Sequence, residues 1–98
     1  MNYNVKILEE ARFDFIESFE YYKEINLKLG EQFKNSFKRS LKTIKSNPLL
    51  FQIRYNNTRV IFVKSFPYLI HFSLEGDTIL IKAIFHTSRD SKIWITRK

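Results

Sequence analysis

The residues best suited to chemistry lie close together at the end of the chain. Residues 86–98 follow a long apolar run and combine cations with an aromatic ring. Its chemically distinctive members are His86, Arg89, Trp94, Arg97 and Lys98. Arginine grips phosphate or carboxylate through paired hydrogen bonds, histidine titrates near neutral pH, and an indole ring stacks on a base. The segment predicts a surface that meets an anionic target, with Arg59 as a further contributor.

A structural interpretation competes with the functional one in this segment. Trp94 could instead fill the bottom of the core, and Arg89 could form a local ion pair with Asp90. His71, in the middle of an expected strand, is interpreted as a half-exposed residue and not as a catalytic base.

Other named chemistries are missing from the sequence. Cysteine is absent, which excludes a disulfide, a thiolate metal site and a cysteine nucleophile. The two glycines are both expected in turns, so the sequence holds no glycine-rich phosphate loop. The two histidines lie far apart without a nearby pair of acids. We therefore expect neither a metal nor a cofactor.

The charge is strongly positive and unevenly distributed. Lysine and arginine number 17 against 10 acids, which gives a net charge of +7. Residues 1–24 are net acidic, so the excess of bases falls in residues 25–98. Such a field attracts polyanions and acidic protein segments. No apolar run is long enough to span a membrane, and the absence of cysteine suits a reducing cytosol, so we expect a cytoplasmic protein.

Two amphipathic helices are expected to support this chemistry. Apolar residues recur every three or four positions over residues 9–26, and again from Leu29 to Ile44. Gly30 is expected to form the tight turn between the helices, and Asn47-Pro48 to end the second. A basic stripe runs beside the second apolar stripe. It consists of Lys34, Lys38, Lys42 and Lys45.

The remaining chain is predicted to form strands. Alternation indicates a strand at residues 2–8, and β-branched residues indicate another at 59–64. Gly76-Asp77 predicts a hairpin between residues 68–75 and 78–86. Pairing across this turn would place apolar residues opposite each other on one face. The expected pairs are Leu74 with Ile79, Phe72 with Ile81, Ile70 with Ala83 and Tyr68 with Phe85. Residues 46–58 are irregular, with a short strand at 51–55 as the alternative.

The position of Arg59 depends on which face of its strand joins the core. If Val60 and Phe62 face the core, Arg59 shares the other face with His71, Lys82 and His86. In the alternative register Arg59 points under the helices and would need a buried acid. We favour the first arrangement, because an unpaired buried arginine is costly. The expected fold is α+β, in which an N-terminal strand, a helical hairpin and a three-stranded antiparallel meander form one sheet.

A set of short motifs accompanies this order of elements. They are Ala11, Tyr21-Tyr22, Asn47-Pro48, Arg59, Phe66-Pro67-Tyr68, His86 through Arg89-Asp90 to Trp94, and Arg97. In order and spacing they resemble the RelE/ParE toxin superfamily across a single domain, residues 1–98. The resemblance implies the toxin of a type II toxin–antitoxin pair, held inactive by an acidic antitoxin whose tail wraps its surface.

The residues also separate the two known activities of that superfamily. RelE-type nucleases, which cleave messenger RNA on the ribosome, carry an arginine after the tyrosine of the third strand, where this chain has Leu69. They place lysines on the preceding strand, of which this chain keeps Lys64. The resemblance therefore favours the ParE branch, whose characterised members bind DNA gyrase and have no recognised catalytic residues. The alternatives are a messenger RNA endonuclease that uses His86, Arg89, Lys82 and Lys64, and a degenerate, non-toxic binding domain.

The basic stripe is the predicted antitoxin surface. An acidic amphipathic segment would suit Lys34, Lys38, Lys42 and Lys45, and addition of a strand at the sheet edge is the alternative.

Overall fold

The structure, a computed structural model, describes residues 3–88. Its elements in chain order are β1 (Asn4–Ile7), α1 (Glu9–Ile25), α2 (Leu27–Ser46), a 3-10 turn (Pro48–Leu50), β2 (Ile53–Tyr55), β3 (Thr58–Phe62), β4 (Tyr68–Glu75) and β5 (Thr78–His86). The strands form one five-stranded sheet in the order β1-β5-β4-β3-β2. β1 runs parallel to β5, and the other neighbours are antiparallel. The predicted α+β fold is confirmed, with β2 as an additional short strand.

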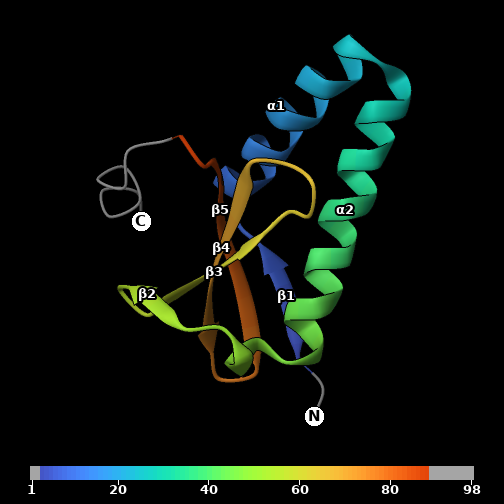
Figure 1. The fold of residues 1–98 in the computed structure, drawn as a ribbon. Coiled ribbons are helices and arrows are strands. Elements are labelled where there is room, and N and C mark those ends of the chain that lie inside the picture. Colours follow the sequence, from blue (N-terminus) through green and yellow to red (C-terminus); the bar gives the residue numbers. More distant parts are fainter. Residues whose placement is uncertain (1–2, 89–98) are drawn as a thin grey trace.

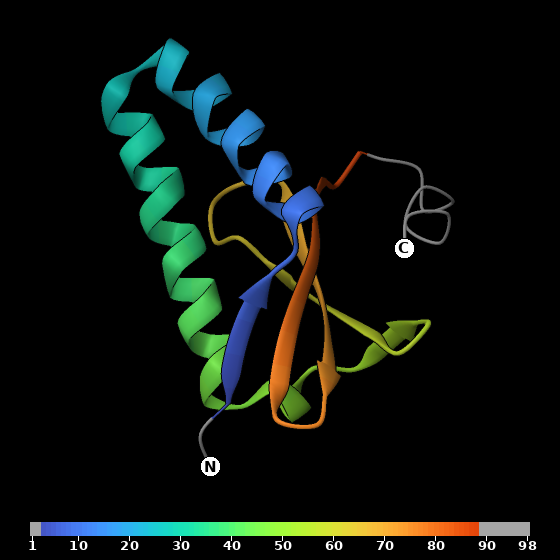
Figure 2. The ribbon, with the colours of Figure 1, turned by 180° about the vertical axis from the view of Figure 1, so that it is seen from behind.

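The two helices lie side by side and pack against the sheet (Figure 1). Their apolar stripes supply the helical half of the core, in which Phe33 and Ile44 are fully buried. The sheet contributes Ile70, Phe72, Ile79, Ile81 and Ile84. The turn between α1 and α2 lies at the same end of the molecule as the 63–67 loop and the end of β5 (Figures 1 and 2). The turn between β4 and β5 lies at the opposite end.

Gly30 does not form the turn between the helices, so that expectation was wrong. A single residue, Asn26, separates the helices, and its side-chain oxygen accepts hydrogen bonds from the amides of Lys28 and Leu29. Gly30 lies inside α2, where an added Cβ would come within 3.0 Å of the Cα and Cβ of Lys23. The glycine is needed because the two helices approach closely there.

The predicted register of the β4–β5 hairpin is correct only for its first half. Leu74 pairs with Ile79 and Phe72 with Ile81, as expected. A bulge then interrupts the ladder, so that Ile70 pairs with Ile84 and Tyr68 with His86. The extra residue is Lys82. It moves Ile84 onto the helix-covered face, where that side chain is 3% exposed.

Arg59 lies on the face that the sequence analysis rejected. It pairs with Phe72, and Ile61 pairs with Ile70, so both share the helix-covered face. No buried acid is needed, because the side chain is only partly buried and its Nε donates to the carbonyl of Phe51 at 2.7 Å. A backbone carbonyl therefore replaces the acidic partner that the sequence argument required.

Candidate functional site

The predicted cationic rim is described only in part. Arg89, Trp94, Arg97 and Lys98 lie outside the described residues 3–88. Of the described members, Arg59 is paired with Phe72 and His86 with Tyr68, four positions apart on β4. That spacing corresponds to about 13 Å along a strand. Arg59 and His86 are therefore not brought together.

His86 faces aromatic and acidic residues of α1. Its ring meets that of Tyr68 edge to face, with centroids 5.1 Å apart. Its Nδ1 accepts a hydrogen bond from the Ser88 amide at 3.0 Å. Two adjoining cavities of about 210 and 460 Å³ border the Tyr68–His86 pair, one beside Asp14 and Glu17 and one beside Tyr21, Tyr22 and Ile25. These surroundings suit a cationic or aromatic group of a partner better than a phosphate.

Tyr22 anchors the helices to this end of the sheet. Its ring lies 4.9 Å from that of Phe66 and 5.2 Å from that of Phe33, centroid to centroid. Burial, followed by the neighbouring hydroxyls of Tyr68 and Tyr21, raises the pKa of Tyr22 above its usual 10.0. The tyrosine is therefore neutral at physiological pH and acts as a packing residue.

Lys82 lies on the face of the sheet away from the helices. Its Nζ donates to Thr58 Oγ1 at 2.7 Å and lies 5.8 Å from the centre of the Tyr55 ring. The Tyr55 hydroxyl is 2.8 Å from Nδ1 of His71. His71 is fully buried and not half-exposed as expected, because its position on β4 turns it into this polar cluster. Lys82 is separated from both Arg59 and His86.

The basic stripe of α2 flanks an apolar groove at its N-terminal half. Lys34 and Lys38 line a cavity of about 290 Å³ between α1, α2 and β1. Its apolar lining consists of Ile7, Phe15, Phe37 and Leu41, and Arg12 adds a third cation. Lys42 and Lys45 lie farther along the exposed side of α2 and do not line it. We name this cavity, with its seven lining residues, the stripe groove.

Asp14 is a structural residue that sequence reasoning missed. Its carboxylate accepts a hydrogen bond from the amide of Ile84 at 2.9 Å. β1 ends at Ile7, so beyond that point the carboxylate takes the place of a strand partner for β5. An acid within the amphipathic pattern of α1, on the side that meets the sheet, was the only available signal.

The described part of the chain has neither a cluster of potential metal ligands nor a helix that could span a membrane. Within residues 3–88, no three histidine, aspartate or glutamate side chains are grouped so that they could hold a metal ion. None of the described helices has the length and apolar character required to cross a membrane.

Comparison with known proteins places this geometry in a family. The model of a family described as "ParE toxin of type II toxin-antitoxin system, parDE" matches residues 5–91. A solved structure titled "Chromosomal ParDE TA system from P. aeruginosa" contains a chain with the same fold. The TM-score is 0.75 at 15% identity, over 86% of this chain and 95% of that one. No curated protein matches in sequence. Since the family match spans most of the sequence, the chain belongs to the ParE family of type II toxin–antitoxin toxins.

Proposed function

We propose that this ParE-family toxin inhibits growth by binding DNA gyrase and not by cleaving RNA. The supporting observation is a row of apolar side chains that runs across the sheet. Leu69 pairs with Phe62 on one side and with Phe85 on the other. The nuclease branch has an arginine at the position of Leu69, and none of these three side chains can hold a scissile phosphate.

The dispersal of the remaining nuclease candidates supports the same proposal. Lys82 is bonded to Thr58, Lys64 borders α2, and His86 faces the tyrosines at the far end of β5. A general base works only within hydrogen-bond reach of the proton it removes, and the phosphate needs its cations at the same point. His86, with the tail residues Arg89, Trp94, Arg97 and Lys98, is proposed to contact the target. Arg59 shares the helix-covered face with His86 but lies four residues away along β4, about 13 Å, and is not included.

The test is expression of the toxin alone in bacteria, with two molecular readouts. We expect growth arrest, double-strand DNA breaks, and inhibition of supercoiling by purified gyrase. Transcripts cut at ribosomal A-site positions, with gyrase unaffected, would instead establish the nuclease. If growth is normal and the protein still binds an acidic protein encoded by a neighbouring gene, it is a non-toxic binding domain.

The proposed surface for a ParD-type antitoxin is the stripe groove. Its apolar lining and three cations complement an acidic amphipathic segment. Lys38→Glu is expected to weaken the toxin–antitoxin complex at least tenfold, because Lys38 is exposed at the groove. Lys45→Glu makes the same charge change on the same helix outside the groove. Equal weakening by the two substitutions would reduce the effect to net charge and refute this placement.

A further inference from the structure

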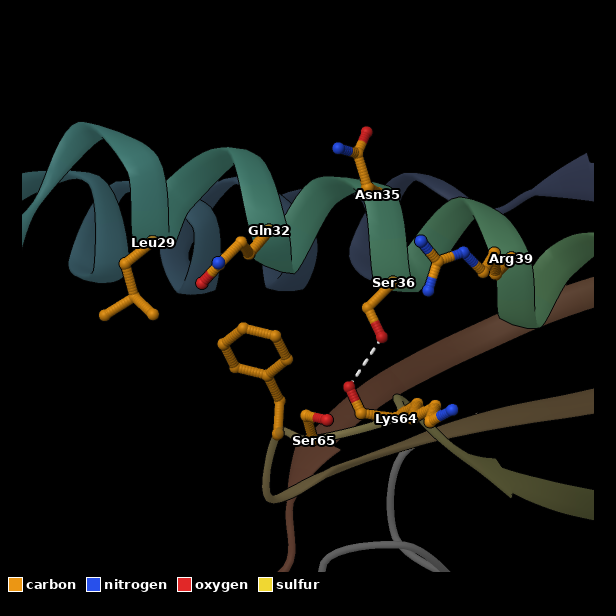
Figure 3. Close-up of a pocket in the computed structure, with 8 residues that line it drawn as sticks. Leu29, Gln32, Asn35, Ser36, Arg39, Lys64 and Ser65 are labelled. Carbon is orange, nitrogen blue, oxygen red and sulfur yellow. Dashed lines mark hydrogen bonds between the residues drawn. The ribbon is translucent and has the colours of Figure 1, made fainter.

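A second groove lies on the other side of α2, against the 63–67 loop. It has a volume of about 410 Å³. Figure 3 shows Leu29 at one end, Gln32 between, and Arg39 and Lys64 toward the other end. Phe66 also lines the groove. We name it the loop groove.

The loop groove is separate from the stripe groove. At 100° per residue, Gln32 and Arg39 lie on the opposite side of α2 from Lys34 and Lys38. None of the residues that line one groove lines the other. A partner segment in the loop groove would therefore leave the proposed antitoxin surface free.

Hydrogen bonds hold the walls of the loop groove in place. Ser36 donates to the carbonyl of Lys64 at 2.6 Å, and Ser40 donates to that of Phe62 at 3.0 Å. Within the loop, the Phe66 amide donates to the carbonyl of Val63 at 3.0 Å, and Ser65 adopts a positive φ of 72°. The groove is therefore formed before a ligand arrives, which lowers the entropic cost of binding.

The lining chemistry is cationic at one end and apolar at the other. No acidic residue lines the groove. Within residues 3–88, neither Arg39 nor Lys64 forms an ion pair with another described residue. Phe66 and Leu29 offer apolar surface, and the Gln32 amide can both donate and accept a hydrogen bond.

We propose that the loop groove binds an extended acidic segment of a partner protein. A carboxylate lies between Arg39 and Lys64, and an apolar side chain lies against Leu29 and Phe66. Arg39 lies ten positions after Leu29, a rise of about 15 Å along the helix. An extended chain covers that length in about four residues, which fixes the spacing of the two anchors.

The arrangement favours a peptide over a nucleic acid. A single strand of nucleic acid needs a row of cations that follows successive phosphates, with open aromatic faces for the bases. The loop groove has its two cations at one end. Its one aromatic ring, that of Phe66, packs against Tyr22 and Phe33 at 4.9 and 5.1 Å.

The probe is a capped peptide, acetyl-Leu-Ser-Gly-Ser-Glu-amide, titrated into the isotopically labelled full chain. We expect saturable amide shifts confined to the 63–67 loop and the facing side of α2. Arg39→Gln should weaken binding at least fivefold, and Lys45→Gln, an equal charge change outside the groove, should change it less than twofold. Both side chains are exposed, and an unchanged spectrum of the free variant confirms its fold.

A matched peptide with Gln in place of Glu completes a double-mutant cycle between the peptide carboxylate and Arg39. It should bind as weakly to the unmodified protein as the Glu peptide binds to Arg39→Gln, and that substitution should weaken it no further. No shift at several millimolar peptide would overturn the proposal, as would equal effects of Arg39→Gln and Lys45→Gln. Tighter binding of a thymidine hexanucleotide at the same residues would assign the groove to nucleic acid instead.

Discussion

Two buried serines on α2 provide a quantitative test of how the helix is attached to the sheet. Ser36 and Ser40 are 5% and 6% exposed and lie one turn apart, so both face the end of β3. They donate to carbonyls of Lys64 and Phe62 at 2.6 and 3.0 Å. Replacing either serine with alanine removes the donor and leaves a partly buried carbonyl without its partner.

Each substitution is expected to lower the free energy of unfolding by about 1 to 2 kcal/mol, since an unsatisfied buried acceptor costs about 1–3 kcal/mol. For a domain of this size the melting temperature should fall by about 4–8 °C per kcal/mol. The double variant should lose less than the sum of the two, because the first change loosens the segment to which the second serine bonds. Urea unfolding followed by circular dichroism measures all three values.

Ser46→Ala is the matched control for this experiment. Its hydroxyl is exposed and donates to the carbonyl of Thr43 in its own helix at 2.9 Å. Its removal should change the stability by no more than about 0.5 kcal/mol. If Ser36→Ala and Ser40→Ala are as mild as this control, water satisfies the two carbonyls and the proposed attachment is wrong.

Substitutions at three further positions test other contacts. Gly30→Ala should lower stability by about 1 kcal/mol in thermal unfolding, because the clash with Lys23 outweighs the gain of about 1 kcal/mol in helix propensity; a rise in melting temperature would contradict the close approach. Asp14→Ala should cost about 2 kcal/mol and speed hydrogen exchange at the Ile84 amide, and Asp14→Asn should cost less; unchanged exchange would refute that bond. The raised pKa of Tyr22 stabilises the fold below pH 10, and this contribution is lost as the pH rises through the folded-state pKa. The Tyr22→Phe variant should therefore lose less stability between pH 9 and 11 than the unmodified protein. Equal losses in the two proteins would argue against the raised pKa.

The local sequence pattern was sufficient to predict most of the helices and strands. The first helix was predicted at residues 9–26 and runs from Glu9 to Ile25. The strands on either side of Gly76-Asp77 have the predicted bounds. A further signal was available at Asn56-Asn57, where both residues have positive φ and form the turn between β2 and β3. That turn signal would have favoured the short strand at residues 51–55 over an irregular segment.

Local pattern failed where contacts between distant segments decide the outcome. The period of two along β5 contains nothing that marks Lys82 as an inserted residue, because the bulge is decided by how Ile84 meets the helices and Asp14. Arg59 was assigned to the wrong face because the Phe51 carbonyl comes from a stretch that the pattern left irregular. The helical periodicity put Lys34 and Lys38 beside the apolar stripe of α2, as the structure has them. No local pattern could indicate the loop groove, because it joins residues far apart in the sequence.

The distribution of charge over the two helices argues for a partner and against internal pairing. α1 is rich in acids and α2 in lysines, so two packed helices could have paired them. Within residues 3–88, the single ion pair between described residues instead joins Lys34 to Glu31 inside α2, at 3.3 Å. Among the described residues the lysines of α2 therefore have no ion-pair partner on α1, and their mutual repulsion costs stability in the isolated protein. An acidic partner would relieve that repulsion, so the same charges that weaken the free toxin would strengthen its complex.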